Sequence, residues 1–169
     1  MGIAAARPVA VETPLGGDEL LLVRMNGTEQ LGRLFQLDLE LFSRNANITA
    51  ESLLGGNMTI RLELQAGGPR FWNGLVSRFA TAGSNEEFFR YEVTLRPWLW
   101  FLTRTSDCRI FQEKSVPDII EQVFSDHGMK DYRLALSGTY EPWVYCVQYG
   151  ETDFNFVSRL MEHEGLYYF

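Results

Sequence analysis

Residues 34–43, LFQLDLELFS, carry the pattern that decides the fold of the N-terminal half. Apolar residues occupy every second position and polar residues the positions between: Phe35, Leu37, Leu39 and Leu41 against Gln36, Asp38 and Glu40. A period of two with one apolar side is typical of a β-strand that is buried on one face. The stretch therefore predicts a half-buried strand.

Similar strand-like stretches lie on both sides of it. ELLLVRM runs into the turn dipeptide Asn26-Gly27, and MTIRLEL, RFWNGLVSRFA and FFRYEVTLRPWLWFL are separated by glycine-rich turns. AESLLGG predicts one helical turn closed by glycine. Short strands at this spacing favour a closed or nearly closed barrel. We expect residues 1–105 to form a β-barrel with at most one helical turn.

The pattern changes near residue 105. In SVPDIIEQVFSDHG an apolar stripe at helical spacing follows Ser115, a natural N-cap, with Asp118 three residues later. WVYCVQY predicts a strand, and a second helix should run from Thr152 or Asp153 to Glu164. Its expected stripe is Phe154, Val157, Leu160 and Met161. LYYF at 166–169 indicates the beginning of another strand. We therefore expect a second domain over residues 106–169.

Composition excludes some classes of function. The 169 residues carry a net charge of −7, which opposes general binding to nucleic acid or to anionic membranes. No apolar run is long enough to span a membrane, and the first residues lack the apolar core of a signal peptide. Without a secretory signal, Cys108 and Cys146 are expected to stay reduced.

Few residues point to chemistry. Three adjacent helical residues, Glu162-His163-Glu164, diverge around the helix axis and make a poor metal site, so we interpret them as a solvated last turn. Cys108 lies in no nucleophile motif, and a buried structural role is the better reading of Cys146. The aromatic segment with Trp98 and Trp100 is read as core in preference to a sugar-binding surface. The sequence predicts no catalytic, metal or cofactor site.

Three long stretches resemble the N-terminal region of the VgrG family, the tip or spike proteins of type VI secretion systems. They are VETPLGGDELLLVRMNGTEQLGRLFQLDLELFS, TLRPWLWFLTRTSDCRIFQEKSVPDIIEQVFSDHG and LSGTYEPWVYCVQYGETDFNFVSRLMEHEGLYYF. The resemblance covers the chain from about Val11 onward. Two positions depart from the family pattern: Gly150 stands where arginine is usual, and His163 where an acidic residue is usual.

The resemblance implies an α+β fold, mostly β, similar to the baseplate hub proteins of contractile-tailed phages. Residues 1–105 would form a barrel related to the tube protein, and residues 106–169 the start of an inserted mixed α/β domain. It implies a homotrimer, contact with the hexameric Hcp tube, baseplate proteins and effectors, and no enzymatic activity or cofactor. It also implies assembly in the bacterial cytoplasm, export by the secretion system, and a chain truncated relative to the family.

Alternatives stay open. A phage or phage-like tail hub would use the same mechanics in another machine. Different classes are a hydrolase that uses Cys108 or paired carboxylates, and a carbohydrate-binding barrel that uses Trp98 and Trp100. The bulky C-terminal residues Leu166, Tyr167, Tyr168 and Phe169 are candidates for an interface, because exposed apolar edges favour association.

Overall fold

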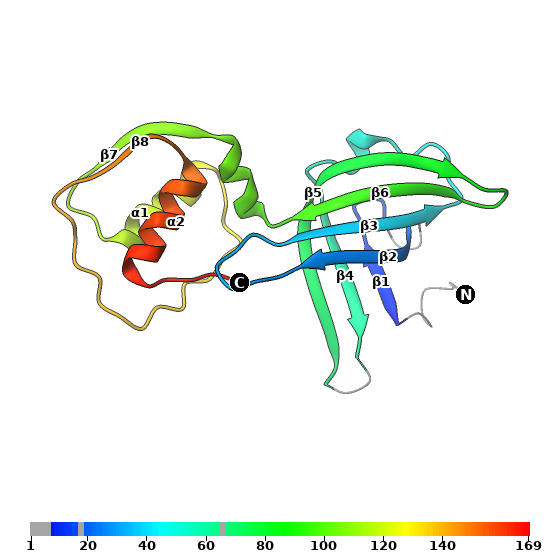
Figure 1. Ribbon diagram of the computed structural model, residues 1–169, viewed down its shortest axis with the longest axis horizontal. Coiled ribbons are helices and arrows are strands. Elements are labelled where there is room, and N and C mark those ends of the chain that lie inside the picture. The colour runs from blue at the N-terminus through cyan, green and yellow to red at the C-terminus, as the bar shows by residue number, and fades with distance from the viewer. Residues whose placement is uncertain (1–7, 17–18, 65–66) are drawn as a thin grey trace. The chain divides into compact units, whose positions relative to one another are not determined.

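The computed structural model describes residues 8–16, 19–64 and 67–169 (Figure 1). Contacts divide the chain into two compact units. Unit 1 comprises Met1–Gln30 and Leu34–Pro97, and unit 2 comprises Leu31–Arg33 and Trp98–Phe169. The division into a domain of residues 1–105 and a domain of residues 106–169 stays a prediction.

Unit 1 is a six-stranded antiparallel sheet in the order β1-β4-β5-β6-β3-β2. Its strands are β1 (Val9–Glu12), β2 (Leu21–Thr28), β3 (Gln36–Ser43), β4 (Asn57–Glu63), β5 (Pro69–Ser84) and β6 (Phe89–Arg96). The long β5 pairs with both β4 and β6, with register shifts between Val76 and Arg78 and between Thr81 and Ser84. Such shifts mark bulges, which bend a strand and let the sheet curl around its core.

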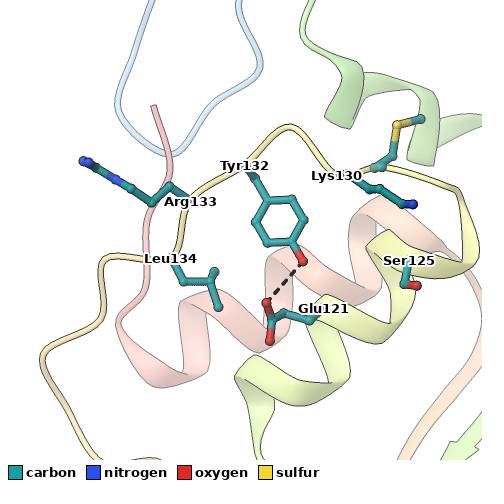
Figure 2. Close-up of a pocket in the computed structure, with 7 residues that line it drawn as sticks. Glu121, Ser125, Lys130, Tyr132, Arg133 and Leu134 are labelled. Atoms are coloured by element: carbon teal, nitrogen blue, oxygen red, sulfur yellow. Dashed lines mark hydrogen bonds between the residues drawn. The ribbon is translucent and has the colours of Figure 1, made fainter.

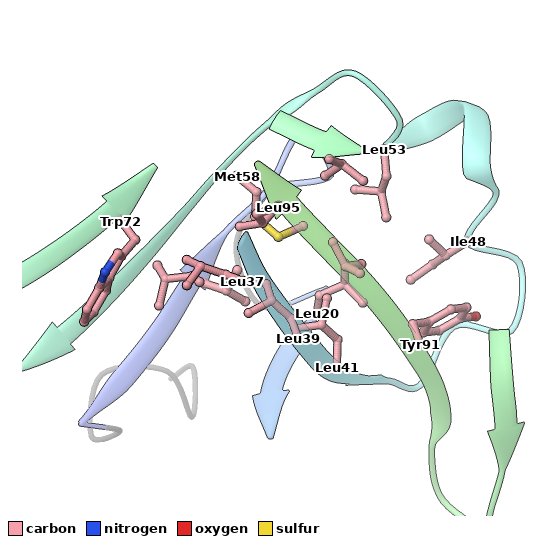
Figure 3. Packing of buried hydrophobic residues seen from close by; sticks show 14 residues of the cluster. Leu20, Leu37, Leu39, Leu41, Ile48, Leu53, Met58, Trp72, Tyr91 and Leu95 are labelled. Carbon is pink, nitrogen blue, oxygen red and sulfur yellow. The ribbon is translucent and has the colours of Figure 1, made fainter. Parts of the chain in front are cut away.

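The core of unit 1 follows directly from the alternation in β3. Leu37, Leu39 and Leu41 are buried, while Asp38 and Glu40 face outward. Figure 3 shows the inward side chains of several strands meeting in one cluster, with Tyr91 and Trp72 toward its two ends. Full burial of each large apolar side chain contributes about 1.5–3 kcal/mol. The expected strand-rich, barrel-like fold is confirmed.

The two edge strands, β1 and β2, flank a groove of about 400 Å³. Its lining is largely apolar: Pro8, Val9, Leu22, Val23, Arg24, Met25 and Leu62. Within the described residues of the sheet, no strand ladder joins β1 to β2. The barrel is therefore curled without being closed by hydrogen bonds.

The turn predicted at Asn26-Gly27 is wrong, because β2 runs through both residues to Thr28. Gly27 pairs with Leu37, and a Cβ atom at Gly27 would collide with the Leu37 side chain and the Gln36 backbone oxygen. The glycine serves close approach of two strands, which is its other common role within a strand.

Helical content in the first 105 residues is also higher than expected. The turn predicted at AESLLGG is present as η2 (Ala50–Ser52), but a second 3₁₀ segment, η3, spans Trp98–Arg104. Pro97 lies between β6 and η3. Because proline has no N–H to donate to a ladder, the predicted strand ends before WLWFL.

Unit 2 contains β7 (Ser106–Phe111), α1 (Val116–Asp126), β8 (Cys146–Thr152) and α2 (Asp153–Glu164). Both predicted helices are confirmed. Ser115 and Asp118 form the expected reciprocal cap at the start of α1. In α2 the buried stripe contains Phe156 where Phe154 was expected, since Phe154 is only half-buried.

β8 begins three residues later than the start of the predicted strand at 143. The residues between α1 and β8 include an isolated bridge between Lys114 and Trp143. Within the described residues, no helix is both long and apolar enough to cross a membrane.

The C-terminal segment leaves α2 through Gly165, whose φ is +69°, and Leu166 N donates to Met161 O at 2.8 Å. The predicted strand over 166–169 is not formed. The segment nevertheless alternates, with Leu166 and Tyr168 half-buried and Tyr167 and Phe169 exposed. Gly32 N donates to Tyr168 O at 2.9 Å, which ties the segment to the 31–33 loop of the same unit.

Candidate functional site: a buried carboxylate network

Asp153 is the most connected polar group of unit 2. It is the first residue of α2 and only 3% exposed. Its position follows from Thr152, the N-cap of α2, whose hydroxyl accepts from Asn155 N at 3.1 Å. Asp153 N donates to Thr105 O at 3.0 Å, which fixes the start of the helix against the end of η3.

Four side chains converge on the two carboxylate oxygens of Asp153. Oδ1 accepts from Arg109 Nη2 at 2.5 Å and from Gln148 Nε2 at 2.7 Å. Oδ2 accepts from Thr105 Oγ1 at 2.7 Å and lies 2.6 Å from His127 Nε2. These donors come from β7, β8, the end of η3 and the C-cap of α1, so one carboxylate joins most of the elements of unit 2.

The donors are themselves held in place. Arg109 Nε donates to Gln148 Oε1 at 2.9 Å, and Arg109 Nη1 donates to Asp126 Oδ2 at 3.1 Å. Gln148 is fully buried and also donates to Glu151 O at 3.0 Å. Because each buried polar group has a partner, the network avoids the penalty of unsatisfied groups.

The network also fixes the charge of Asp153. Burial by itself raises the pKa of this carboxyl. The hydrogen bonds from Gln148, Thr105 and His127, together with the charge of Arg109, lower the pKa by more than burial raises it. The pKa of Asp153 is therefore lowered overall. The carboxylate is therefore ionised at neutral pH.

A histidine beside a buried aspartate is part of many hydrolytic sites, but catalysis also needs a nucleophile. The hydroxyl of the network, Thr105 Oγ1, donates to Asp153 Oδ2. Cys108 is exposed, and its strand neighbour Arg109, not Cys108, contacts the network. Cys146 is buried, and burial raises the pKa of its thiol. Both cysteines are free. The arrangement orients and holds elements of the fold.

A separate cleft of about 460 Å³ lies along α1 (Figure 2). It is lined by Glu121, Ser125, Met129, Lys130, Tyr132, Arg133 and Leu134. Tyr132 OH donates to Glu121 Oε1 at 3.2 Å, and Figure 2 shows the Arg133 and Lys130 side chains extending to opposite sides. The charged groups therefore do not converge on a common point.

The sites considered from the sequence lie elsewhere. His163 packs its ring edge-on against Trp143, with centroids 5.0 Å apart, and Glu162 is exposed. Trp98 packs against Phe124 and Tyr132, and its Nε1 donates to Asp131 O at 3.0 Å. Trp98 and Trp100 are both half-buried, so the core interpretation of this segment stays a prediction. Among the described residues, no group of three or more acidic, histidine or cysteine side chains is placed to hold a metal ion.

Sequence reasoning missed the network. Arg109 and Gln148 occupy inward positions of β7 and β8, next to the buried Phe111 and Cys146. Polar residues at the inward positions of two alternating strands are a signal of a buried polar pair. The sequence therefore contains a signal for the Arg109–Gln148 pair. It contains no signal that identifies Asp153 as the carboxylate that binds this pair.

Comparisons with known proteins agree with the fold. The pattern of the phage tail baseplate hub (GPD) family matches residues 28–169. The Pseudomonas aeruginosa type VI secretion system spike proteins VgrG1a and VgrG1c are each 55% identical to this chain over 96% of its length. The match spans 25% and 22% of those proteins, so the chain corresponds to about a quarter of its relatives.

More distant relatives include a toxin and a secretion-system component. The Vibrio cholerae actin cross-linking toxin VgrG1 is 32% identical over 89% of this chain, and the match spans 15% of the toxin. An E. coli component of the type VI secretion system, described as structurally similar to the T4 bacteriophage tail proteins gp27 and gp5, matches with a TM-score of 0.71 and 31% identity. That match covers 84% of this chain and 42% of the other.

A tail protein from Neisseria meningitidis shares the fold, with a TM-score of 0.63 at 11% identity, over 94% of this chain and 45% of the other. A family match over most of the chain, high identity to spike proteins and the same fold in a secretion component agree with one another. This chain therefore belongs to the phage tail baseplate hub family and to the VgrG family of type VI secretion spike proteins, of which it spans about a quarter.

Proposed function

We propose that the chain is a structural, non-enzymatic part of a type VI secretion tip. In this proposal it trimerises within the longer protein, caps the hexameric Hcp tube and, with baseplate proteins and effectors, is exported during delivery. The observation that carries the proposal is the 55% identity to VgrG1a over 96% of the chain. The buried network supports a structural role, because a single carboxylate joins segments of both strands and both helices of unit 2.

The proposal assigns the C-terminal segment to an interface. Tyr167 and Phe169 are exposed, and their rings lie on one side, with centroids 6.5 Å apart. Leu31 is exposed in the loop that Gly32 joins to Tyr168. Burial raises the pKa of Tyr168, whereas its neighbour Arg33 lowers it by less. The anchored Tyr168 thus holds the two exposed rings of Tyr167 and Phe169 in place for a partner.

Sedimentation over a concentration series tests this assignment. We expect the chain to self-associate, with a trimer as the favoured form, and to bind purified Hcp rings. The double variant Tyr167→Ser/Phe169→Ser should weaken association at least tenfold, whereas Leu54→Ser, at an exposed apolar residue of unit 1, should not. The proposal for this region would be contradicted if the wild-type chain stays monomeric at high concentration and does not bind Hcp rings.

A phage or phage-like tail hub is the second candidate. The fold shared with the Neisseria meningitidis tail protein favours it, although the identity there is only 11%. Genes for secretion sheath and membrane-complex components beside the reading frame would support the secretion system. Genes for head and packaging proteins would support the phage.

A further inference from the structure

β7 and β8 form a two-stranded antiparallel sheet with two chemically different faces. Phe111, Cys146 and Gln148 point inward, and Phe111 stacks on Phe156 of α2 with ring centroids 5.5 Å apart. The inner face is therefore covered by the helical side of unit 2.

The outer face carries Cys108, Ile110, Val147 and Tyr149. Ile110 pairs with Val147 and Cys108 with Tyr149, so the four side chains form a compact group. Ile110 is 62% exposed and Tyr149 is 83% exposed, and the thiol of Cys108 is exposed as well. None of the four is an acidic or basic residue. Tyr145, just before β8, is 54% exposed as well.

A sheet of two strands is marginally stable in water and needs packing against further elements. Contiguous exposed apolar patches of this kind mark surfaces that another part of an assembly covers. Four or five side chains are too few for an independent interface, which needs about 20–30 residues on each partner. A further segment of the same polypeptide can cover so small a surface. Because such a segment is tethered, it needs no large interface of its own.

The relatives supply such polypeptide. The match spans 25% of VgrG1a, and the structural match spans 42% of the E. coli secretion component. We propose that the outer face of the β7–β8 sheet is a docking surface for an apolar segment of the polypeptide that longer members of the family carry outside the matched region. It is distinct from the C-terminal interface, so either assignment can fail alone.

Cys108 reports on this face, and the buried Cys146 is an internal control in the same protein. VgrG1a whose matched region is replaced by this chain is compared with the 169-residue chain alone. Both are treated with N-ethylmaleimide, and peptide mapping by mass spectrometry gives the rate at each cysteine. We expect Cys108 to react at least tenfold more slowly in the longer protein and Cys146 to react slowly in both.

Measuring the monomeric and oligomeric fractions separately identifies what covers the face. Protection that persists in the monomer supports the proposal. Equal Cys108 rates in the two proteins, or protection that vanishes when oligomers dissociate, overturns it, the second result assigning the face to another copy. As an independent measure, Tyr149→Ser should lower the thermal midpoint of the longer protein more than that of the short chain, whereas Leu54→Ser should affect both alike. Equal effects of Tyr149→Ser on both proteins contradict the proposal.

Discussion

Unit 1 and unit 2 are stabilised in different ways. Unit 1 gathers inward apolar side chains from several strands into one cluster, so its stability is spread over many contacts. Unit 2 also has an apolar core, but five of its backbone segments meet at the single carboxylate of Asp153. A distributed core should tolerate the loss of one contact better than a network with one centre, and the following predictions test that difference.

Asp153→Ala should have the largest effect. It leaves Arg109 and Gln148 without their common acceptor inside the fold. Breaking a buried ion pair on one side costs about 3–5 kcal/mol. Hydrogen exchange should accelerate in α1, β8 and the start of α2 and stay unchanged in β3 and β6. Equal acceleration in both units would show that they do not differ in the proposed way.

Leu41→Ala should cost unit 1 about 3 kcal/mol, through lost burial and the cavity left behind. Leu41 is fully buried in the core cluster. The substitution should lower the protection against hydrogen exchange in several strands and not in β3 alone. Exchange rates in β3, β5 and β6 measure this. Loss of protection confined to β3 would contradict a distributed core.

Acidification should weaken unit 2 by a smaller amount than Asp153→Ala, because the protonated side chain is still present. The folded pKa of Asp153 is lowered. Its contribution is therefore complete above the unfolded value, about 3.9, and is lost as pH falls through the lowered folded pKa. Unfolding followed from about pH 5 to pH 2 should show this loss, and the Asp153→Asn variant should lack that component. The same pH dependence in both proteins would assign the loss to other carboxylates.

Ser115→Ala should have the smallest effect, about 1 kcal/mol, from the lost cap of α1. Thr49→Ala is the matched control, because Thr49 precedes η2 but makes no side-chain cap hydrogen bond. Chemical denaturation should show a lower unfolding free energy for Ser115→Ala and almost no change in the unfolding free energy for Thr49→Ala. Equal effects would remove the cap as the cause.

The sequence was most informative where a single physical rule governs a segment. The alternation at 35–41 and the cap at Ser115 predicted β3 and the start of α1, because side-chain direction and capping are local properties. Gly27 misled, because its role depends on Leu37 of the neighbouring strand, which local turn preference does not include. Phe154 misled for a similar reason: the half-buried and buried positions of α2 are set by what packs against the helix.

The network could be predicted only in part. Arg109 and Gln148 are recognisable as inward polar residues of two strands, but their meeting with His127 depends on how α1 returns to the sheet. Long-range side-chain partners of this kind are fixed by tertiary packing. Nothing in the sequence alone distinguishes Asp153 from the other carboxylates of the chain as the centre of the network.

The bond between Gly32 N and Tyr168 O has a consequence for folding during synthesis. The flanks of the 31–33 loop belong to unit 1, whose strands are complete once Arg96 has been made. The loop itself obtains its partner only when Tyr168 emerges, much later in translation. Pairings between residues so distant in sequence form slowly, because the intervening chain must first be ordered. On the ribosome, β2 and β3 should therefore pair early, while their connecting loop stays unanchored until nearly the whole described chain has been made.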